Sequence, residues 1–364
     1  MSRAEPTRSR WLPGTELAIA ALVGAVLFGL TGVEIIWVVG GVAGGWVTCW
    51  AFRRRGAAAE PSSRVRELGQ VLVGAAIGPT LAAQQFTASP GHLALLVAAV
   101  LAVLGGSLAV ARLYCAYGQV DGVTAGMATL PGGLGIMPSV AAALGRPAGL
   151  VAIVQATRMT VVVVMVLAVL PVGAPTMTGS SRSGALLPDS PSGWMYSGGL
   201  LLGAFVAARV AARLRIPVPT LLGPLLFGCV FALGLRAGGV DPGMLAAPLA
   251  QEYIGQALLG ITVGEYLAQR FTGAAAALRG GVAAVLVLAG FAVVLAFAMT
   301  TVSPWPFLTC LLMVAPGGAP EMVVIAAATD SELALVLAAQ TGRQVLVNLL
   351  MPVWIRLFTR FDRA

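Results

Sequence analysis

The chain has 364 residues, of which 58% are apolar and only 10% are charged, and its mean hydropathy is +0.92. A soluble domain usually carries about 25% charged residues, because these residues cover its water-facing surface. The composition therefore excludes an ordinary soluble domain and predicts a protein of the lipid bilayer. All basic residues are arginines, so the net charge of +8 has to be mapped along the chain before it is interpreted.

Cysteine and histidine are too few and too scattered for several kinds of site. The cysteines, Cys49, Cys115, Cys229 and Cys310, form no C-x-x-C pair, so neither a disulfide framework nor a zinc cage is predicted. We interpret them as small buried apolar residues. His92 is the only histidine, which leaves no cluster for a copper, iron or zinc centre. We predict no metal, no cofactor and no catalytic residue, and we do not expect an enzyme.

Twelve apolar segments approach the length of a membrane crossing, which is about 20 residues. A cleaved signal peptide is an alternative for the first segment, but its sequence has a counterpart in the second half, which favours a membrane helix. A more polar stretch predicts an external linker (172–192) between a first repeat (1–171) and a second repeat (193–364). The segments are 14–32, 35–52, 67–86, 92–117, 122–145 and 148–171, then 193–212, 217–236, 252–269, 280–303, 305–329 and 333–357.

Short motifs recur in the same order in both halves, at an offset of 185 or 186 residues. Three such coincidences at nearly one spacing indicate a gene duplication, so the two halves should share a fold. The matching motifs are 68–78 with 254–264, Pro131-Gly132-Gly133 with Pro316-Gly317-Gly318, and Gln155-x-x-Arg158 with Gln340-x-x-Arg343.

The positions of the arginines decide between parallel and inverted repeats. If the N-terminus is cytoplasmic and the fifth segment of each half enters and leaves on one side, 18 of the 22 arginines are cytoplasmic. Only Arg182 and Arg236 then lie outside, and only Arg158 and Arg343 lie within the membrane. We therefore expect an all-α polytopic membrane protein with two inverted repeats of about five transmembrane helices each. Both termini should be cytoplasmic, in a multi-pass protein of the bacterial inner membrane.

Each fifth segment should contain a re-entrant or broken stretch at its Pro-Gly-Gly motif, because proline lacks a backbone donor and glycine weakens a helix. Non-helical backbone at the middle of a membrane is tolerated only where protein buries it or water reaches it. Two interpretations are open. The breaks are packing kinks, or their exposed amides bind an anionic substrate, and their pairing in inverted repeats favours the substrate site.

Arg158 and Arg343 lie about ten residues into their helices, near the predicted midplane. An arginine there costs about 2.5–3.5 kcal/mol on insertion scales, so each should face a partner or an aqueous cavity. Glu321, after the second break, is the best acidic partner, and Gln155 and Gln340 lie three residues before the arginines on the same helical face. Two arginines against one carboxylate leave a positive charge that suits an anionic ligand or an anionic lipid headgroup. The alternative is a purely structural role, in which one arginine pairs with Glu321 and the other bonds backbone carbonyls.

Two small-residue motifs predict close helix packing, namely Gly74-x-x-x-Gly78 and Gly260-x-x-x-Gly264. Glu265 follows the second motif near the cytoplasmic end of its helix. We expect its carboxylate to be solvated rather than to act as a proton relay.

The full set of duplicated motifs, including Gly-Gln-x-Leu-x-Gly before each small-residue pair, resembles the AbrB membrane-protein family of Gram-negative bacteria, over roughly residues 15–360. This family is unrelated to the small soluble DNA-binding AbrB regulators. Its members carry labels such as ammonia monooxygenase or regulator of gene expression. The first label fits poorly with one histidine, and the second implies an indirect role because the sequence has no DNA-reading arm.

The leading hypothesis is a secondary transporter or exporter of a small anionic organic solute. The alternative is a membrane-embedded regulator that alters gene expression indirectly. The expected partners are membrane lipid and a small-molecule anion, without nucleic acid, and a homo-oligomer is left open.

Overall fold

The computed structural model describes residues 12–31, 36–55, 61–83, 90–132, 136–173, 185–240, 247–269, 275–329 and 331–361. Over these residues the chain forms fifteen α-helices and no strand. The expected all-helical fold is confirmed.

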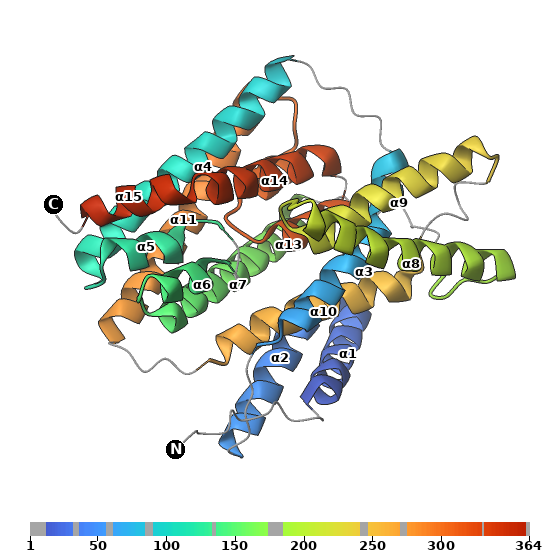
Figure 1. Cartoon of the computed structure of the whole chain (residues 1–364), viewed down its shortest axis with the longest axis horizontal. Helices are drawn as coiled ribbons and strands as arrows, with labels where there is room; N and C mark the ends of the chain where they lie inside the picture. The colour runs from blue at the N-terminus through green and yellow to red at the C-terminus, as the bar shows by residue number, and fades with distance from the viewer. Residues whose placement is uncertain are drawn as a thin grey trace. The chain divides into compact units, whose positions relative to one another are not determined.

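The helices form two compact units, and each unit draws on both halves of the chain (Figure 1). Unit 1 consists of Met1–Gln85 and Thr176–Ala268, and unit 2 consists of Phe86–Pro175 and Gln269–Ala364. Each half thus gives its first three helices to unit 1 and its remaining helices to unit 2. The units are defined by packing and the repeats by sequence, so the predicted repeat boundaries stay a prediction.

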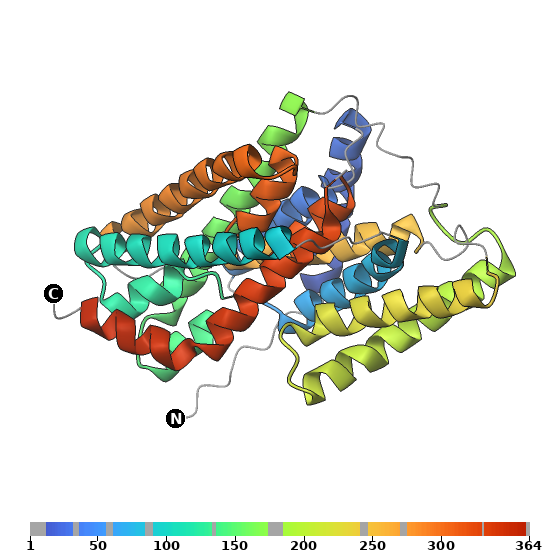
Figure 2. The same ribbon diagram turned by 90° about the horizontal axis from the view of Figure 1, so that it is seen from above.

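Within the described residues, unit 1 contains six helices in the packing order α1, α2, α10, α3, α9, α8. Helices α8 and α9 lie side by side, as both views show (Figures 1 and 2). The six helices are α1 (Leu12–Thr31), α2 (Ile36–Arg54), α3 (Ser63–Ala83), α8 (Pro191–Arg213), α9 (Pro219–Ala237) and α10 (Leu249–Leu267).

Glycines let α2 approach α10 and let α3 approach α9. A Cβ atom on Gly78 of α3 would lie 2.5 Å from the carbonyl oxygen of Leu225 on α9. A Cβ atom on Gly264 of α10 would overlap the carbonyl oxygen of Val42 on α2. Backbone atoms cannot move aside as a flexible side chain can, so only glycine fits at these positions. The predicted close packing is confirmed, and Gly74 and Gly260 make contacts of the same kind.

Unit 2 contains two long helices, α4 and α11, and two interrupted helix pairs that pack against α7 and α14. One pair is α5–α6, beside α7 (Figure 1), and the other is α12–α13, which packs against α14. The described helices of this unit are α4 (Pro90–Tyr117), α5 (Gly122–Thr129), α6 (Ile136–Ala143), α7 (Ala148–Gly173), α11 (Ala275–Val302), α12 (Phe307–Val314), α13 (Ala319–Ala327), α14 (Leu333–Leu349) and α15 (Met351–Phe361).

Five of the described helices are long and apolar enough to cross a membrane, namely those in α4, α7, α8, α9 and α11. A sixth candidate is α14 with α15, which are bent by 71° (Figure 2). The bend within the segment 333–357 was not predicted, and it follows from Pro352, which has no N–H to donate and whose ring crowds the preceding turn. The number and length of these helices are those of a multi-pass membrane protein.

Candidate functional site

All predicted site residues belong to unit 2, where they surround the two chain breaks. Helix α12 ends at Val314 and α13 begins at Ala319, so Pro316, Gly317 and Gly318 lie between two helices. At the first break α5 ends at Thr129 and α6 begins at Ile136, with Pro131 and Gly132 between them. Gly133 lies outside the described residues. A re-entrant path through a membrane stays a prediction for both segments.

Arg158, on α7, binds the carbonyl groups at the first break. Its Nη1 donates to the carbonyl oxygens of Thr129 and Leu130, both at 3.1 Å, and its Nη2 donates to Gln155 Oε1 at 3.2 Å. Gln155 Nε2 donates to the carbonyl oxygens of Met127 at 2.7 Å and Leu130 at 3.3 Å. The last carbonyls of a helix have no partner inside it, and a cation is favoured there. The arginine and the glutamine therefore stabilise the open end of α5.

Arg343, on α14, binds the second break in the same way. Its Nη1 donates to the Ala315 carbonyl oxygen at 2.8 Å, and its Nη2 donates to the Gly317 carbonyl oxygen at 3.1 Å and to Gln340 Oε1. Gln340 Nε2 donates to the carbonyl oxygens of Leu312 at 2.6 Å and Ala315 at 3.3 Å. The acceptors of the two glutamines match at an offset of 185 residues. The predicted pairs thus occupy equivalent positions at the two breaks.

Each of these two helices also touches the break in the other half of the chain. Gln344 of α14 donates from Nε2 to the Gly132 carbonyl oxygen at 2.7 Å. A Cβ atom on Gly318 would lie 2.6 Å from Met159 Cε of α7, and Met159 corresponds to Gln344 at the offset of 185. The sequence analysis missed Gln344, because its partner lies in the other half, 212 residues away. Its position one residue after Arg343 was the only available signal.

The two guanidinium groups form one buried, positively charged cluster. Arg158 is 1% exposed and Arg343 is 3% exposed, and the residue that follows each arginine contacts the opposite break. Nε of each arginine has no hydrogen-bond partner among the described residues. The cluster therefore combines two positive charges with two N–H groups that could each donate a hydrogen bond to a negatively charged oxygen.

Glu321 lies in the first turn of α13 and is 2% exposed. A Cβ atom on Gly318, the N-cap residue, would overlap Glu321 Oε2, so the carboxylate lies beside the N-terminus of α13. A negative charge is favoured at that end of a helix. The predicted pairing of Glu321 with one arginine stays a prediction.

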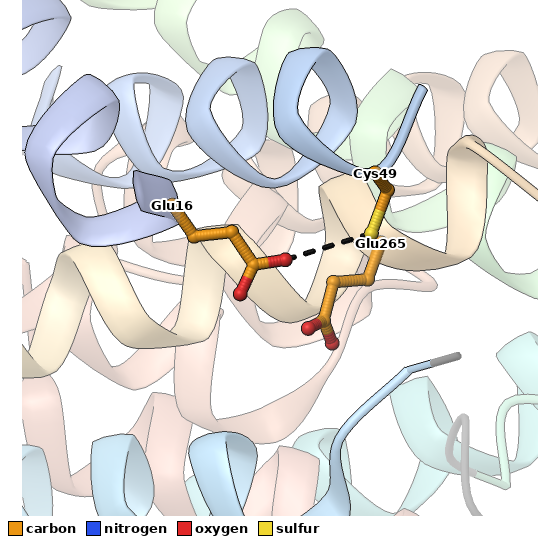
Figure 3. Close-up of side chains that lie close together, drawn as sticks. All are labelled: Glu16, Cys49 and Glu265. Atoms are coloured by element: carbon orange, nitrogen blue, oxygen red, sulfur yellow. Dashed lines mark hydrogen bonds between the residues drawn. The ribbon is translucent and has the colours of Figure 1, made fainter. Parts of the chain in front are cut away.

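A second group of reactive side chains lies in unit 1, and the sequence analysis did not predict it. Glu16 of α1, Cys49 of α2 and Glu265 of α10 point toward one another, and one ligand atom of each lies within 4.8 Å of the others (Figure 3). Glu265 is 0% exposed, so the expectation of a solvated carboxylate is wrong, because α1, α2 and α10 pack around it. Acidic residues inside apolar segments were the signal that should have identified the group.

Comparison with known proteins places the chain in a family. The model of a family described as "Transition state regulatory protein AbrB" matches residues 37–359. The chain belongs to the AbrB family. "Uncharacterized protein YhjN" of Bacillus subtilis (strain 168) is 28% identical to this AbrB-family chain, with 94% of the chain and 91% of the relative covered. "Putative regulator AbrB" of Escherichia coli (strain K12) is 27% identical, with 80% of the chain and 82% of the relative covered. No solved structure matches.

The resemblance inferred from the duplicated motifs is thereby confirmed. The long apolar helices agree with the membrane-protein AbrB family rather than with the small soluble one. Neither relative carries a name that states a substrate or a reaction.

Proposed function

We propose that this AbrB-family protein is a secondary transporter or exporter of a small anionic organic solute. The observation that carries the proposal is the buried pair of arginines in unit 2, Arg158 and Arg343, each bonded to a chain break. Two such charges repel one another, and Glu321 brings one negative charge to the second break. An anion with two oxygens would neutralise the remaining charge and accept from both Nε–H groups.

The interrupted helices support a transporter more than a static scaffold. Broken helices beside buried charges are typical of secondary transporters, where substrates bind near the bilayer midplane. Here the two interrupted pairs, α5–α6 and α12–α13, pack against the helices that carry the arginines. In this proposal the protein is a carrier and not an enzyme. It lies in the bacterial inner membrane with both termini cytoplasmic, which the distribution of arginines supports.

A ligand-stabilisation screen tests the binding step. The purified protein would be heated in detergent with organic carboxylates, organic phosphates and neutral analogues of the same size. We expect at least one anion to raise the Tm of wild type and of the Arg112→Gln control, since Arg112 is exposed on α4 of the same unit. The same anion should not stabilise Arg343→Gln. Equal stabilisation of all three proteins would contradict an anion site at the arginines.

The name of the Escherichia coli relative supports a second candidate, a regulator of gene expression. The two functions differ in what the arginines must do. The test returns the Arg343→Gln variant to a host strain from which the gene has been deleted. A transporter that affects expression through its solute needs Arg343, so the variant should not restore transcript levels. A regulator that acts through a protein partner does not need Arg343. Restoration of normal transcript levels by Arg343→Gln would therefore favour the regulator.

A further inference from the structure

The group formed by Glu16, Cys49 and Glu265 lies wholly in unit 1 and plays no part in the proposed anion site. The three residues come from three different helices, and they are 1%, 0% and 0% exposed. Burying two carboxylates close together is costly unless protons or a cation reduce their negative charge. The packing of α1, α2 and α10 therefore depends on what neutralises this group.

The distances within the group match those of a metal site. Cys49 Sγ lies 3.5 Å from Glu16 Oε1. A tetrahedral zinc ion with a sulfur ligand at about 2.3 Å and an oxygen ligand at about 2.0 Å separates the two ligand atoms by about 3.5 Å. A carboxylate oxygen of Glu265 lies within 4.8 Å of both of these atoms, so side-chain rotations would bring all three ligand atoms to one ion.

Neighbouring groups hold Glu265 in place and balance the charge. The backbone N–H of Ser62 donates to Glu265 Oε2 at 2.8 Å, which orients the carboxylate as outer-shell partners of metal ligands do. Arg53 lies four residues after Cys49 on α2, and its Nη1 donates to the carbonyl oxygen of Ala268, three residues after Glu265. Two carboxylates and a thiolate carry three negative charges, which a divalent cation and the Arg53 guanidinium together would neutralise.

An independent observation comes from Thr48. Its Oγ1 is buried and has no hydrogen-bond partner among the described residues, and the residue is 2% exposed. Thr48 lies four residues after Gly44, which contacts α1, and three residues after Gly45, which contacts α10. Helical periodicity therefore directs Thr48 toward the seam between α1 and α10, which also contains the carboxylates. A metal ion with a bound water would supply the partner that this hydroxyl lacks.

We infer that Glu16, Cys49 and Glu265 form a binding site for a divalent cation of the zinc type that links α1, α2 and α10. The mixed sulfur and oxygen ligands favour Zn²⁺ or Co²⁺ over Mg²⁺ and Ca²⁺, which prefer oxygen alone. Without a metal, the Cys49 thiol proton lies in the hydrogen bond to Glu16 Oε1. When the cation binds, it replaces this proton, which is released to solvent.

Cobalt titration of the metal-stripped full-length protein in detergent tests the site, because a cobalt–thiolate bond gives a charge-transfer band in the near ultraviolet. We expect wild type to bind one Co²⁺ per chain with this band. Cys49→Ser should lose the band, whereas Cys310→Ser should keep it, because Cys310 is equally buried but lies in unit 2. Glu265→Gln should weaken Co²⁺ binding by about 10- to 100-fold.

Thermal unfolding with Zn²⁺ gives a second readout that does not depend on cobalt. Zn²⁺ should raise the Tm of wild type and of Cys310→Ser, whereas Mg²⁺ should not. The Tm of Cys49→Ser should not change with Zn²⁺. Each sample should elute as a single peak in gel filtration, so that only folded protein is compared. Arg343→Gln should still bind Co²⁺, which separates this site from the proposed anion site. A wild type without the cobalt band, or a band that persists in Cys49→Ser, would overturn the inference. The carboxylates would then be neutralised by protons and by the Arg53 guanidinium.

Discussion

At the scale of single residues, the arginine–glutamine pairs explain how a chain can be interrupted inside a protein. Each pair satisfies carbonyl groups that a broken helix leaves without partners. The sequence predicted both pairs because their spacing repeats in the two halves. It favoured Glu321 as the partner of one arginine and gave carbonyl acceptors only as the alternative, because side-chain types reveal charges but not which backbone groups a fold leaves open.

Replacing either arginine by lysine tests this carbonyl-binding role. Lysine keeps the charge but lacks the planar fork that reaches two carbonyls and a glutamine at once. We expect Arg343→Lys to lower the free energy of unfolding by about 1.5–3 kcal/mol, the usual value for a lost hydrogen bond to a charged group. Thermal unfolding in detergent measures the change, with the exposed Arg112→Lys as control. Equal Tm values for the two variants would argue against the role.

Gln344 offers a second test, because it links α14 to the first break. Gln344→Leu keeps a similar volume but leaves the Gly132 carbonyl without this donor. A buried carbonyl that loses its partner costs about 1–3 kcal/mol. The variant should unfold at a lower temperature than wild type, whereas Met159→Leu, at the equivalent position of α7, should change little. If both variants behave alike, the hydrogen bond of Gln344 contributes nothing to stability.

At the scale of helices, the predicted segments and the observed helices agree closely, since charges and turn residues mark the ends of apolar stretches. In the last segment a bend that was not predicted separates α14 from α15. The alternation of apolar and charged residues after Pro352 is typical of an amphipathic helix. Hydropathy averaged over the whole segment does not reveal this alternation, so the separate helix α15 was not predicted. Trp354 and Phe358 are buried on α15, whereas Arg356 and Arg360 are exposed.

The glycine contacts between α2 and α10 predict a strong dependence on side-chain size. Gly264→Ala would place a methyl group against the α2 backbone, and overpacking of this kind costs about 1–3 kcal/mol. Gly234→Ala, on α9 of the same unit, has nothing within 4 Å and should gain up to about 1 kcal/mol from the helix propensity of alanine. Thermal unfolding should therefore shift in opposite directions for the two variants. A rise in Tm for Gly264→Ala would contradict the close packing.

At the scale of the whole molecule, the two halves were predicted as successive membrane repeats, whereas the compact units draw helices from both. Sequence repeats show which segments are equivalent, but not which segments pack together, because packing joins helices far apart in the chain. The group of Glu16, Cys49 and Glu265 was missed for the same reason. Its members lie in three segments that no motif connects.

The predicted topology can be tested by cysteine labelling from outside the cell. Residues 53–66 should be cytoplasmic and the 172–192 linker external, because most arginines then lie inside. In a background without Cys115 and Cys229, the two cysteines that are not buried, a membrane-impermeant reagent should modify Ser181→Cys and spare Ala58→Cys. The reverse pattern would rule out inverted repeats with cytoplasmic termini.

Solute uptake into proteoliposomes tests the central claim most directly. The anion that stabilises the purified protein would be supplied outside vesicles that contain wild type, Arg343→Gln or the Arg112→Gln control. We expect uptake by wild type and by the control, and a loss of at least about 10-fold in Arg343→Gln, which corresponds to one lost charge-assisted contact. Equal uptake by Arg343→Gln and wild type, or no uptake by wild type of any anion that binds, would contradict a transporter built around the buried arginines.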